Sequence, residues 1–233
     1  MQTSHNESKC LSVVMPCYNE AKTVVNCVNR VLASPFLYEL IIIDDGSTDE
    51  TPKLINLIAD PRVHIITQAA NQGKGAALKA GFAHATGDFV IVQDADLEYD
   101  PVEYGRILRP LLDNKADVVY GSRFIGSDAH RVLYFWHSVA NRLLTLISNM
   151  LTNLNLTDME TCYKCFRNEI IKSIDLRETR FGIEPEMTAK IAKMKCRVYE
   201  VGISYDGRTY VEGKKIGLRD AFRAIYCVIK YSI

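Results

Sequence analysis

Residues 40–49 read LIIIDDGSTD, an uncharged run rich in β-branched side chains that stops at two aspartates and a glycine. Such a run is typical of a strand buried on both faces of a parallel sheet, and the polar residues after it predict a turn at the strand's carboxyl end. Residues 89–98, FVIVQDADLE, repeat the pattern, and residues 11–15 form another apolar run that ends at Pro16. These runs predict buried parallel strands that end in polar turns.

Segments with helical spacing alternate with these strands through the first 120 residues, which predicts an α/β fold with a doubly wound, mostly parallel, Rossmann-like sheet. We expect strands over 11–15, 40–43, 63–67, 89–93, 118–119, 162–166 and 198–204. We expect helices over 20–32 (with Asn19 as N-cap), 49–58, 74–85, 141–154, 185–194 and 218–230. Ligands bind beyond the carboxyl ends of such strands, where Asp44, Asp45, Asp94 and Asp96 stand.

The composition is that of one globular domain, residues 11–233, preceded by a loose polar tail, residues 1–10. Lys plus Arg equals Asp plus Glu at 28 each, so no global basic field indicates a nucleic acid partner. Seven cysteines, an odd number, and no leader peptide favour a reducing, cytoplasmic compartment. Cys162 and Cys165 form a CxxC pair without a second pair, so we interpret them as small buried side chains. No apolar stretch is long enough to span a membrane.

The segment after the strand at 89–93 carries Asp94, Asp96 and Glu98 at alternate positions. In an extended turn these carboxylates can point the same way, which is costly unless a positive charge lies among them. Mg²⁺ or Mn²⁺, bound by carboxylates, water and a diphosphate, fits this pattern. A solvated acidic loop is the alternative that the pattern alone leaves open.

Two further segments suggest nucleotide binding. Tyr18 could stack on a base and an aspartate of the pair at 44–45 could bind ribose, although Asn19, Ser47 and Asp49 could equally serve as helix caps. The glycines and the lysine of residues 71–77, NQGKGAA, could approach an anion, although such a segment alone is more often a tight turn. No GxGxxG follows the first strand, which makes a Rossmann dehydrogenase a weaker alternative.

Together these stretches resemble family 2 glycosyltransferases of the GT-A fold, and most of all the polyprenyl-phosphate (dolichyl-phosphate) sugar synthases. The resemblance rests on VVMPCYNEA (13–21), IIIDDGSTDET (41–51), NQGKGAALKAG (71–81), GDFVIVQDADLEYDP (87–101) and VVYGSRF (118–124). It implies a nucleotide-sugar-binding half, residues 11–122, and an acceptor-binding α+β extension, residues 123–233.

The resemblance also implies roles for single residues on the donor side. The nucleoside would be held by Pro16, Tyr18, Glu20, Asp44 and Asp45, with Lys74 near the base or ribose. Asp94 and Asp96 would bind the metal, with Glu98 as a further ligand. The diphosphate would be closed over by a basic loop that carries Arg208, Lys214 and Lys215.

On the acceptor side, the resemblance implies that Arg123 of the GSR motif and Ser138 meet the acceptor phosphate. Relatives often carry an arginine where this chain has Tyr134, and Arg131 or His130 could replace it. Residues 158–167, DMETCYKCFR, resemble the family's D-x-x-T-G-F-K-x-F-R with Cys162 in place of glycine.

The implied reaction is an inverting transfer of a hexose from a UDP- or GDP-linked donor to a polyprenyl phosphate, whose dianion needs no general base. A sugar or protein hydroxyl acceptor is the alternative, with Glu184 or Glu186 as the base. A non-catalytic nucleotide-sugar-binding subunit is disfavoured by the intact carboxylates. We expect the apolar face of residues 143–154 to pack in the core, and the last helix to contact a membrane or a membrane subunit, which would make the chain peripheral at the cytoplasmic face.

Overall fold

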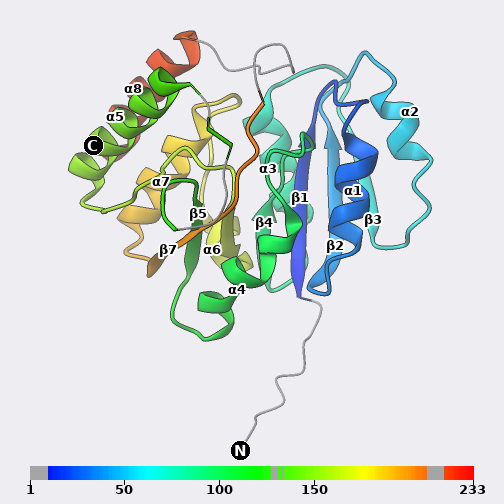
Figure 1. Cartoon of the computed structure of the whole chain (residues 1–233), viewed down its shortest axis with the longest axis horizontal. Coiled ribbons are helices and arrows are strands. Elements are labelled where there is room, and N and C mark those ends of the chain that lie inside the picture. Colours follow the sequence, from blue (N-terminus) through cyan, green and yellow to red (C-terminus); the bar gives the residue numbers. More distant parts are fainter. Residues whose placement is uncertain (1–9, 127–130, 133, 209–217) are drawn as a thin grey trace, which may run out of the picture.

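The computed structural model describes residues 10–126, 131, 132, 134–208 and 218–233, with the side chains of 218–220 left aside (Figure 1). Its sheet has seven strands in the order β3-β2-β1-β4-β6-β5-β7. Only β6 runs antiparallel to its neighbours β4 and β5, so the sheet is mostly parallel, as predicted. The strands are β1 (Leu11–Cys17), β2 (Leu37–Asp44), β3 (Val63–Thr67), β4 (Phe89–Val92), β5 (Val118–Ser122), β6 (Lys164–Arg167) and β7 (Val198–Gly202).

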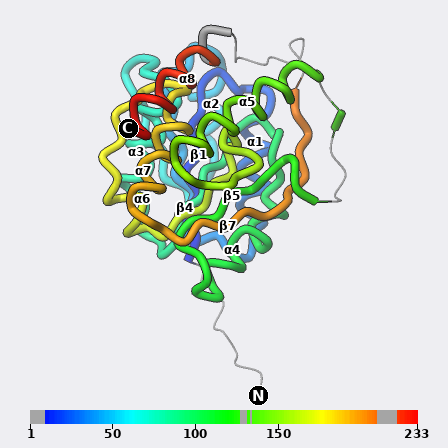
Figure 2. Tube along the Cα trace, turned by 90° about the vertical axis from the view of Figure 1, so that its left-hand side faces the viewer, coloured from blue at the N-terminus to red at the C-terminus, as the bar shows by residue number. Residues whose placement is uncertain are grey.

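Helices cover both faces of this sheet. Figures 1 and 2 show α1 and α4 on one face and α3, α6 and α7 on the other, while α5 and α8 pack against each other and against α7. The helices are α1 (Val24–Leu32), α2 (Thr51–Asn56), α3 (Lys74–His84), α4 (Tyr104–Leu112) after the short 3-10 helix η1 (Pro101–Glu103), α5 (Phe135–Thr152), α6 (Asn168–Ser173), α7 (Ile183–Lys193) and α8 (Leu218–Ser232).

The central strands are buried on both faces because helices lie on either side. Ile42 of β2 pairs with Met15 of β1 and with Ile65 of β3, and the side chains of Ile42 and Met15 have no exposed surface. The same register sets Cys17 beside Asp44, so β1 and β2 end together. The acidic turns that follow β1, β2 and β4 therefore meet at one edge of the sheet.

Several expected boundaries were wrong. Helix α1 begins at Val24 rather than at residue 20, and Asn19 is not its N-cap: it adopts a left-handed backbone with φ 53°, and its Oδ1 accepts from the backbone of Thr48. Helices α4 and α6 were not predicted, and α5 begins at Phe135, six residues before the expected start at 141. In α4, Pro110 obscures a helix whose buried residues are Tyr104, Ile107, Leu108 and Leu111.

The apolar side chains of α5 do not all enter the core. Leu144 is buried, but Leu143, Met150 and Leu151 are exposed, so the expected core packing is wrong for these three. None of the helices in the described part of the chain is long and apolar enough to cross a bilayer. All seven cysteines lie within the described residues, where none forms a disulfide, and all are buried except the half-buried Cys196, as their interpretation as small apolar side chains predicts.

Candidate active site

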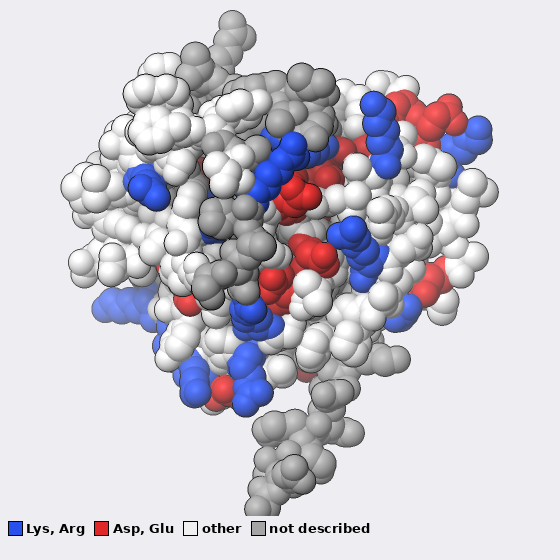
Figure 3. Space-filling model, in the orientation of Figure 1, with Lys and Arg blue, Asp and Glu red and all other residues white. Residues whose placement is uncertain are grey.

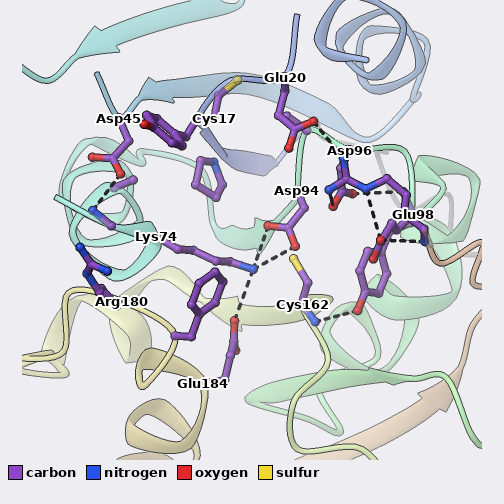
Figure 4. Close-up of a pocket in the computed structure, with 18 of the residues that line it drawn as sticks. Cys17, Glu20, Asp45, Lys74, Asp94, Asp96, Glu98, Cys162, Arg180 and Glu184 are labelled. Atoms are coloured by element: carbon purple, nitrogen blue, oxygen red, sulfur yellow. Dashed lines mark hydrogen bonds and ion pairs between the residues drawn. The ribbon is translucent and has the colours of Figure 1, made fainter. Parts of the chain in front are cut away.

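A cavity of 460 Å³ opens at the carboxyl ends of β1 and β4. Figure 3 shows acidic side chains gathered in a hollow on this face with basic side chains beside them, and Figure 4 shows how the lining residues lie. The structure thus brings most of the predicted site together. The predicted residues that line it are Pro16, Tyr18, Glu20, Asp45, Lys74, Asp94, Asp96, Glu98, Arg123 and Arg208.

Lys74 faces Asp94 across the cavity floor. Its ammonium lies 2.8 Å from Asp94 Oδ1 and 3.7 Å from Glu184 Oε1 (Figure 4). Burial disfavours the charge of Lys74, but Asp94 and Glu184 outweigh it and hold the pKa of Lys74 well above its ordinary value. The ammonium of Lys74 was predicted to lie near the base or ribose. In the structure it lies beside Asp94, at the start of the acidic turn after β4.

Arg208 lies among three acidic side chains from two segments, the turn after β1 and the turn after β4. Its guanidinium contacts Asp96 at 2.7 Å, Glu20 at 3.1 Å and Glu98 at 3.4 Å. Burial, together with the charges of Asp94 and Glu98, raises the pKa of Asp96 to about 7, which Arg208 partly opposes. This region is therefore crowded with negative charge and stabilised by a cation.

Glu98 is already engaged by the segment that carries Arg208. It accepts hydrogen bonds from the Tyr205 hydroxyl at 2.8 Å and from the Arg208 backbone at 2.9 Å. Within the described residues, no three Asp, Glu, His or Cys side chains converge as a metal-binding group. Asp94 and Asp96 instead fit a divalent cation that takes two carboxylates and completes its shell with diphosphate and water oxygens.

The two adjacent aspartates after β2 have different surroundings. Both oxygens of Asp45 accept backbone hydrogen bonds, from Gln72 and from Gly73, each at 2.8 Å, so Asp45 fixes the loop before α3 while lining the cavity. Asp44 accepts from the Ser47 backbone at 3.0 Å and is absent from the described lining. Asp44 therefore shapes the turn, and its predicted contact with the nucleoside is not supported by its position.

The glycines of residues 71–77 serve a close approach of backbones. Gly73 has φ +100°, and a Cβ there would lie 2.5 Å from the Thr179 carbonyl oxygen. A Cβ on Gly75 would lie 2.5 Å from the Glu178 carbonyl oxygen. These glycines meet protein backbone rather than an open anion site, and the contact brings the following residues, Arg180 and Phe181, to the cavity wall.

Arg123, which lines the cavity, is held by a buried carboxylate. Its Nε and Nη2 lie 2.6 and 2.7 Å from the two oxygens of Asp158, which has no exposed surface. Asn141 of α5 donates to Asp158 at 2.9 Å, and Tyr205 lies 5.1 Å below the guanidinium. Although burial opposes its charge, Asp158 keeps the pKa of Arg123 well above its ordinary value.

The structure does not support several other residues that were predicted to meet the acceptor. Ser138, near the start of α5, is not among the described residues that line the cavity, and Arg131 donates to the Gly207 carbonyl oxygen. Glu186 is fully buried, and its oxygens accept from the backbones of Arg177 and Glu178, which removes it as a candidate base. Lys214, Lys215 and His130 lie outside the described residues.

Several lining residues carry no motif signal and were missed as site residues. Tyr99 and Tyr205 pack with ring centroids 5.2 Å apart, and Glu160 was passed over inside the DMETCYKCFR segment. Glu184, predicted as a candidate base for a hydroxyl acceptor, lines the cavity. The missed residues reach the site through tertiary packing. They are Tyr99, Glu160, Arg180, Phe181 and Tyr205, together with Cys162, which was expected only as a core side chain.

Residues 12–175 match the family model described as "Glycosyl transferase family 2". Similar curated proteins are undecaprenyl-phosphate 4-deoxy-4-formamido-L-arabinose transferases from Yersinia pestis (strain Pestoides F), 31% identical over 213 residues, and from Yersinia enterocolitica serotype O:8, 28% identical over 213 residues. Each match covers 88% of this chain, and the chain spans only 62% of the relatives' length.

Solved structures of Mycobacterium tuberculosis glucosyl-3-phosphoglycerate synthase are similar in fold. The complex with Mn²⁺, UDP and phosphoglyceric acid has a TM-score of 0.74 and 20% identity, and the match covers 97% of this chain and 79% of that one. The mostly parallel sheet, the acidic turn after β4 and the family match agree. The chain belongs to glycosyl transferase family 2.

Proposed function

We propose that this chain is a metal-dependent glycosyltransferase that moves a sugar, as a hexose, from a nucleoside diphosphate to a polyprenyl phosphate with inversion at the anomeric carbon. The observation that carries the proposal is the cavity itself, which sets Asp94 and Asp96 against Arg123 across one space. The names of the curated relatives, undecaprenyl-phosphate sugar transferases, support the acceptor class. The similar fold crystallised with Mn²⁺ and UDP supports the donor class.

On the donor side, Tyr18 and Pro16 provide the apolar surface for the base, and Asp45 fixes the adjoining loop. Asp94 and Asp96 would hold Mg²⁺ or Mn²⁺, which supplies charge neutralisation of the diphosphate leaving group. Arg208 can exchange its carboxylate partners for diphosphate oxygens, since its planar fork suits both. These residues would align the donor and stabilise the departing nucleotide.

On the acceptor side, Arg123 lines the cavity with its orientation fixed by Asp158. Its remaining N–H groups would bind the acceptor phosphate, whose dianion attacks the anomeric carbon opposite the leaving diphosphate. Because a phosphomonoester is largely dianionic at neutral pH, the step needs no general base. A hydroxyl acceptor would need one, and Glu184 is then the candidate that lines the cavity.

A lipid acceptor requires the site to reach a bilayer. Exposed apolar side chains on α5 and α8, two helices that pack against each other, form what we name the apolar helix surface. Figure 3 shows mostly uncharged side chains over α5, and on α8 Arg223 and Lys230 flank Tyr226. Helix α5 contains no Asp or Glu, and its Asn141 connects to Arg123 through Asp158. We place this surface on a membrane, peripherally and at the cytoplasmic face, where free cysteines stay reduced. The surface comprises Phe135, Trp136, Leu143, Leu146, Met150, Phe222, Tyr226 and Ile229.

The test is a transfer assay with labelled UDP-glucose, GDP-mannose and UDP-N-acetylglucosamine, Mg²⁺ or Mn²⁺, and a short polyprenyl phosphate. We expect label in the organic phase that depends on both the metal and the lipid. Metal-dependent donor hydrolysis without lipid label would contradict the acceptor and redirect the search to hydroxyl compounds. A protein that binds and hydrolyses none of the donors would contradict the enzyme activity as a whole.

A further inference from the structure

Glu160 brings to the cavity a carboxyl group whose Oε1 receives no hydrogen bond from the described residues. It lies in the loop before β6, between Asp158, which holds Arg123, and Cys162, and it lines the cavity with Glu184 of α7. Glu160 Oε1 and Glu184 Oε1 are both buried, and no group in the described part of the chain donates a hydrogen bond to either. Buried polar groups are nearly always hydrogen-bonded, so two such oxygens in one cavity need an explanation.

The neighbouring cations do not donate the missing hydrogen bonds. Lys74 Nζ lies 3.7 Å from Glu184 Oε1, an ion-pair distance, and is bound to Asp94 at 2.8 Å. The charged groups that face Glu160 are Glu184, Lys164, Arg123 and Asp158. The ammonium of Lys164 binds Glu184 Oε2 and the Thr161 carbonyl oxygen, and Arg123 binds Asp158 through two hydrogen bonds. Burial first, then the charge of Glu184, raises the pKa of Glu160 to about 7. The ionised carboxyl group of Glu160 therefore destabilises the folded protein.

The position of Glu160 matches the place that the transferred sugar would take in the proposed reaction. Glu184 adjoins Lys74 and Asp94 on the diphosphate side, whereas Glu160 is close enough to Arg123, on the acceptor side, to feel its charge. The transferred sugar must lie between these two sides. Sugar hydroxyls are hydrogen-bond donors and can satisfy carboxylate oxygens, which accept.

We propose that Glu160 is a specificity-determining residue whose carboxyl group, together with that of Glu184, receives hydroxyl hydrogens of the sugar on the donor. The inference rests on the proposed function and names which part of the donor this wall recognises. A site built to bond a hydroxyl rejects an analogue that lacks it, because its own polar groups are then left buried and unpaired.

Binding affinities measured by titration calorimetry in the presence of Mn²⁺ test this proposal on the wild type, Glu160→Gln and Glu160→Ala. The ligands are the tightest of UDP-glucose, GDP-mannose and UDP-N-acetylglucosamine, and the matching nucleoside diphosphate. Both variants should bind the diphosphate as the wild type does and the nucleotide sugar about tenfold more weakly. Unchanged affinity for the nucleotide sugar, or an equal loss for both ligands, would overturn the proposal. A wild type that binds no nucleotide would instead defeat the proposed function itself, and the inference with it.

Thermal unfolding without ligand separates recognition from a structural role. Since the pKa of Glu160 is raised in the folded state, the folded protein binds the proton more tightly and loses stability as pH rises through about 7. Glu160→Gln should therefore raise Tm, by more at about pH 8 than at about pH 5. Glu39→Gln is the matched control: Glu39 is 6% exposed and accepts from Ser12 and Thr86, so its loss should lower Tm and leave both affinities unchanged. A lower Tm for Glu160→Gln would assign it a structural role and overturn the proposal.

Discussion

The guanidinium Nη2 of Arg208 lies 2.7 Å from Asp96 Oδ2, within the acidic group that the proposed metal would neutralise. Arg208 also contacts Glu20 and Glu98. The turn after β1, the turn after β4 and the segment after β7 thus meet around one positive charge. The guanidinium of Arg208 therefore supplies positive charge at the place where the proposed metal ion would supply it. A metal ion bound to Asp96, as we propose, would compete with Arg208 for this carboxylate.

Replacement of Arg208 should consequently have opposite effects on metal binding and on turnover. In Arg208→Gln, we expect the nucleotide-free protein to bind Mn²⁺ about tenfold more tightly, because one competing charge has gone, as measured by electron paramagnetic resonance. Turnover should fall, since the diphosphate loses a partner. Arg208→Lys should lie between the two for both quantities. Weaker Mn²⁺ binding in Arg208→Gln would show that Arg208 does not compete with the metal.

Asp96 should be indispensable once the donor is bound. Asp96→Asn removes a carboxylate ligand, and we expect kcat to fall by about 10²–10³ at saturating Mn²⁺, the range typical of a lost electrostatic stabiliser. Asp113→Asn, at an exposed ion pair with Arg109 after α4, should retain full turnover. Full turnover of Asp96→Asn would refute the metal assignment.

Arg123 should affect the acceptor more than the donor. In Arg123→Lys the charge stays but the two-pronged contact with Asp158 is lost, so we expect KM for the polyprenyl phosphate to rise about tenfold. KM for the donor should stay within about twofold, which steady-state kinetics with each substrate varied in turn will measure. An increase confined to the donor KM would place Arg123 at the diphosphate instead.

Acid stability should depend on an ion pair far from the site. Hydrogen bonds from Arg197 lower the pKa of Asp117 to about 2, and Arg167 adds to this effect. A carboxyl whose pKa is lowered by folding stabilises the protein above its unfolded pKa and loses that contribution as pH falls from about 4 to about 2. Asp117→Asn should therefore be less stable by about 1–2 kcal/mol near neutral pH, and match the wild type near about pH 2 in urea unfolding. An equal deficit at both pH values would contradict the lowered pKa.

The apolar helix surface should bind lipid. Trp136 and Phe135, at the start of α5, are 74% and 69% exposed, so their replacement by Ser leaves the core intact. The double variant should float with anionic vesicles far less than the wild type and keep its Tm. Leu57→Ser, at a 73% exposed side chain after α2, is the control and should float normally. Normal flotation of the double variant would exclude this face as the membrane contact.

The sheet was predictable because its signal is local. Residues 40–45 carry a strand and its polar end in one uninterrupted run, and parallel packing fixes where such ends meet. The sequence therefore predicted that residues such as Asp45, Asp94 and Asp96 lie at the carboxyl edge of the sheet, where they line the cavity. Helix α4 was missed because Pro110 lies inside it, although its buried residues follow a helical period.

The rest of the site depends on contacts between distant segments. Phe181 lines the cavity because Gly73 and Gly75 admit the backbone of residues 178–180, a relationship that no local pattern contains. Glu186 looked as available as Glu184 from the sequence, yet one turns into the core and the other toward the cavity. Which way a helical side chain faces is decided by tertiary packing.

In the proposed reaction, a phosphate oxygen attacks the anomeric carbon in one displacement. NMR of the purified lipid product tests this step, because it reports both the phosphorus coupling of the anomeric proton and the anomeric configuration. We expect a sugar joined through its anomeric carbon to the lipid phosphate, with configuration opposite to that in the donor. A product that retains the donor configuration, or a sugar joined through a hydroxyl oxygen, would contradict it.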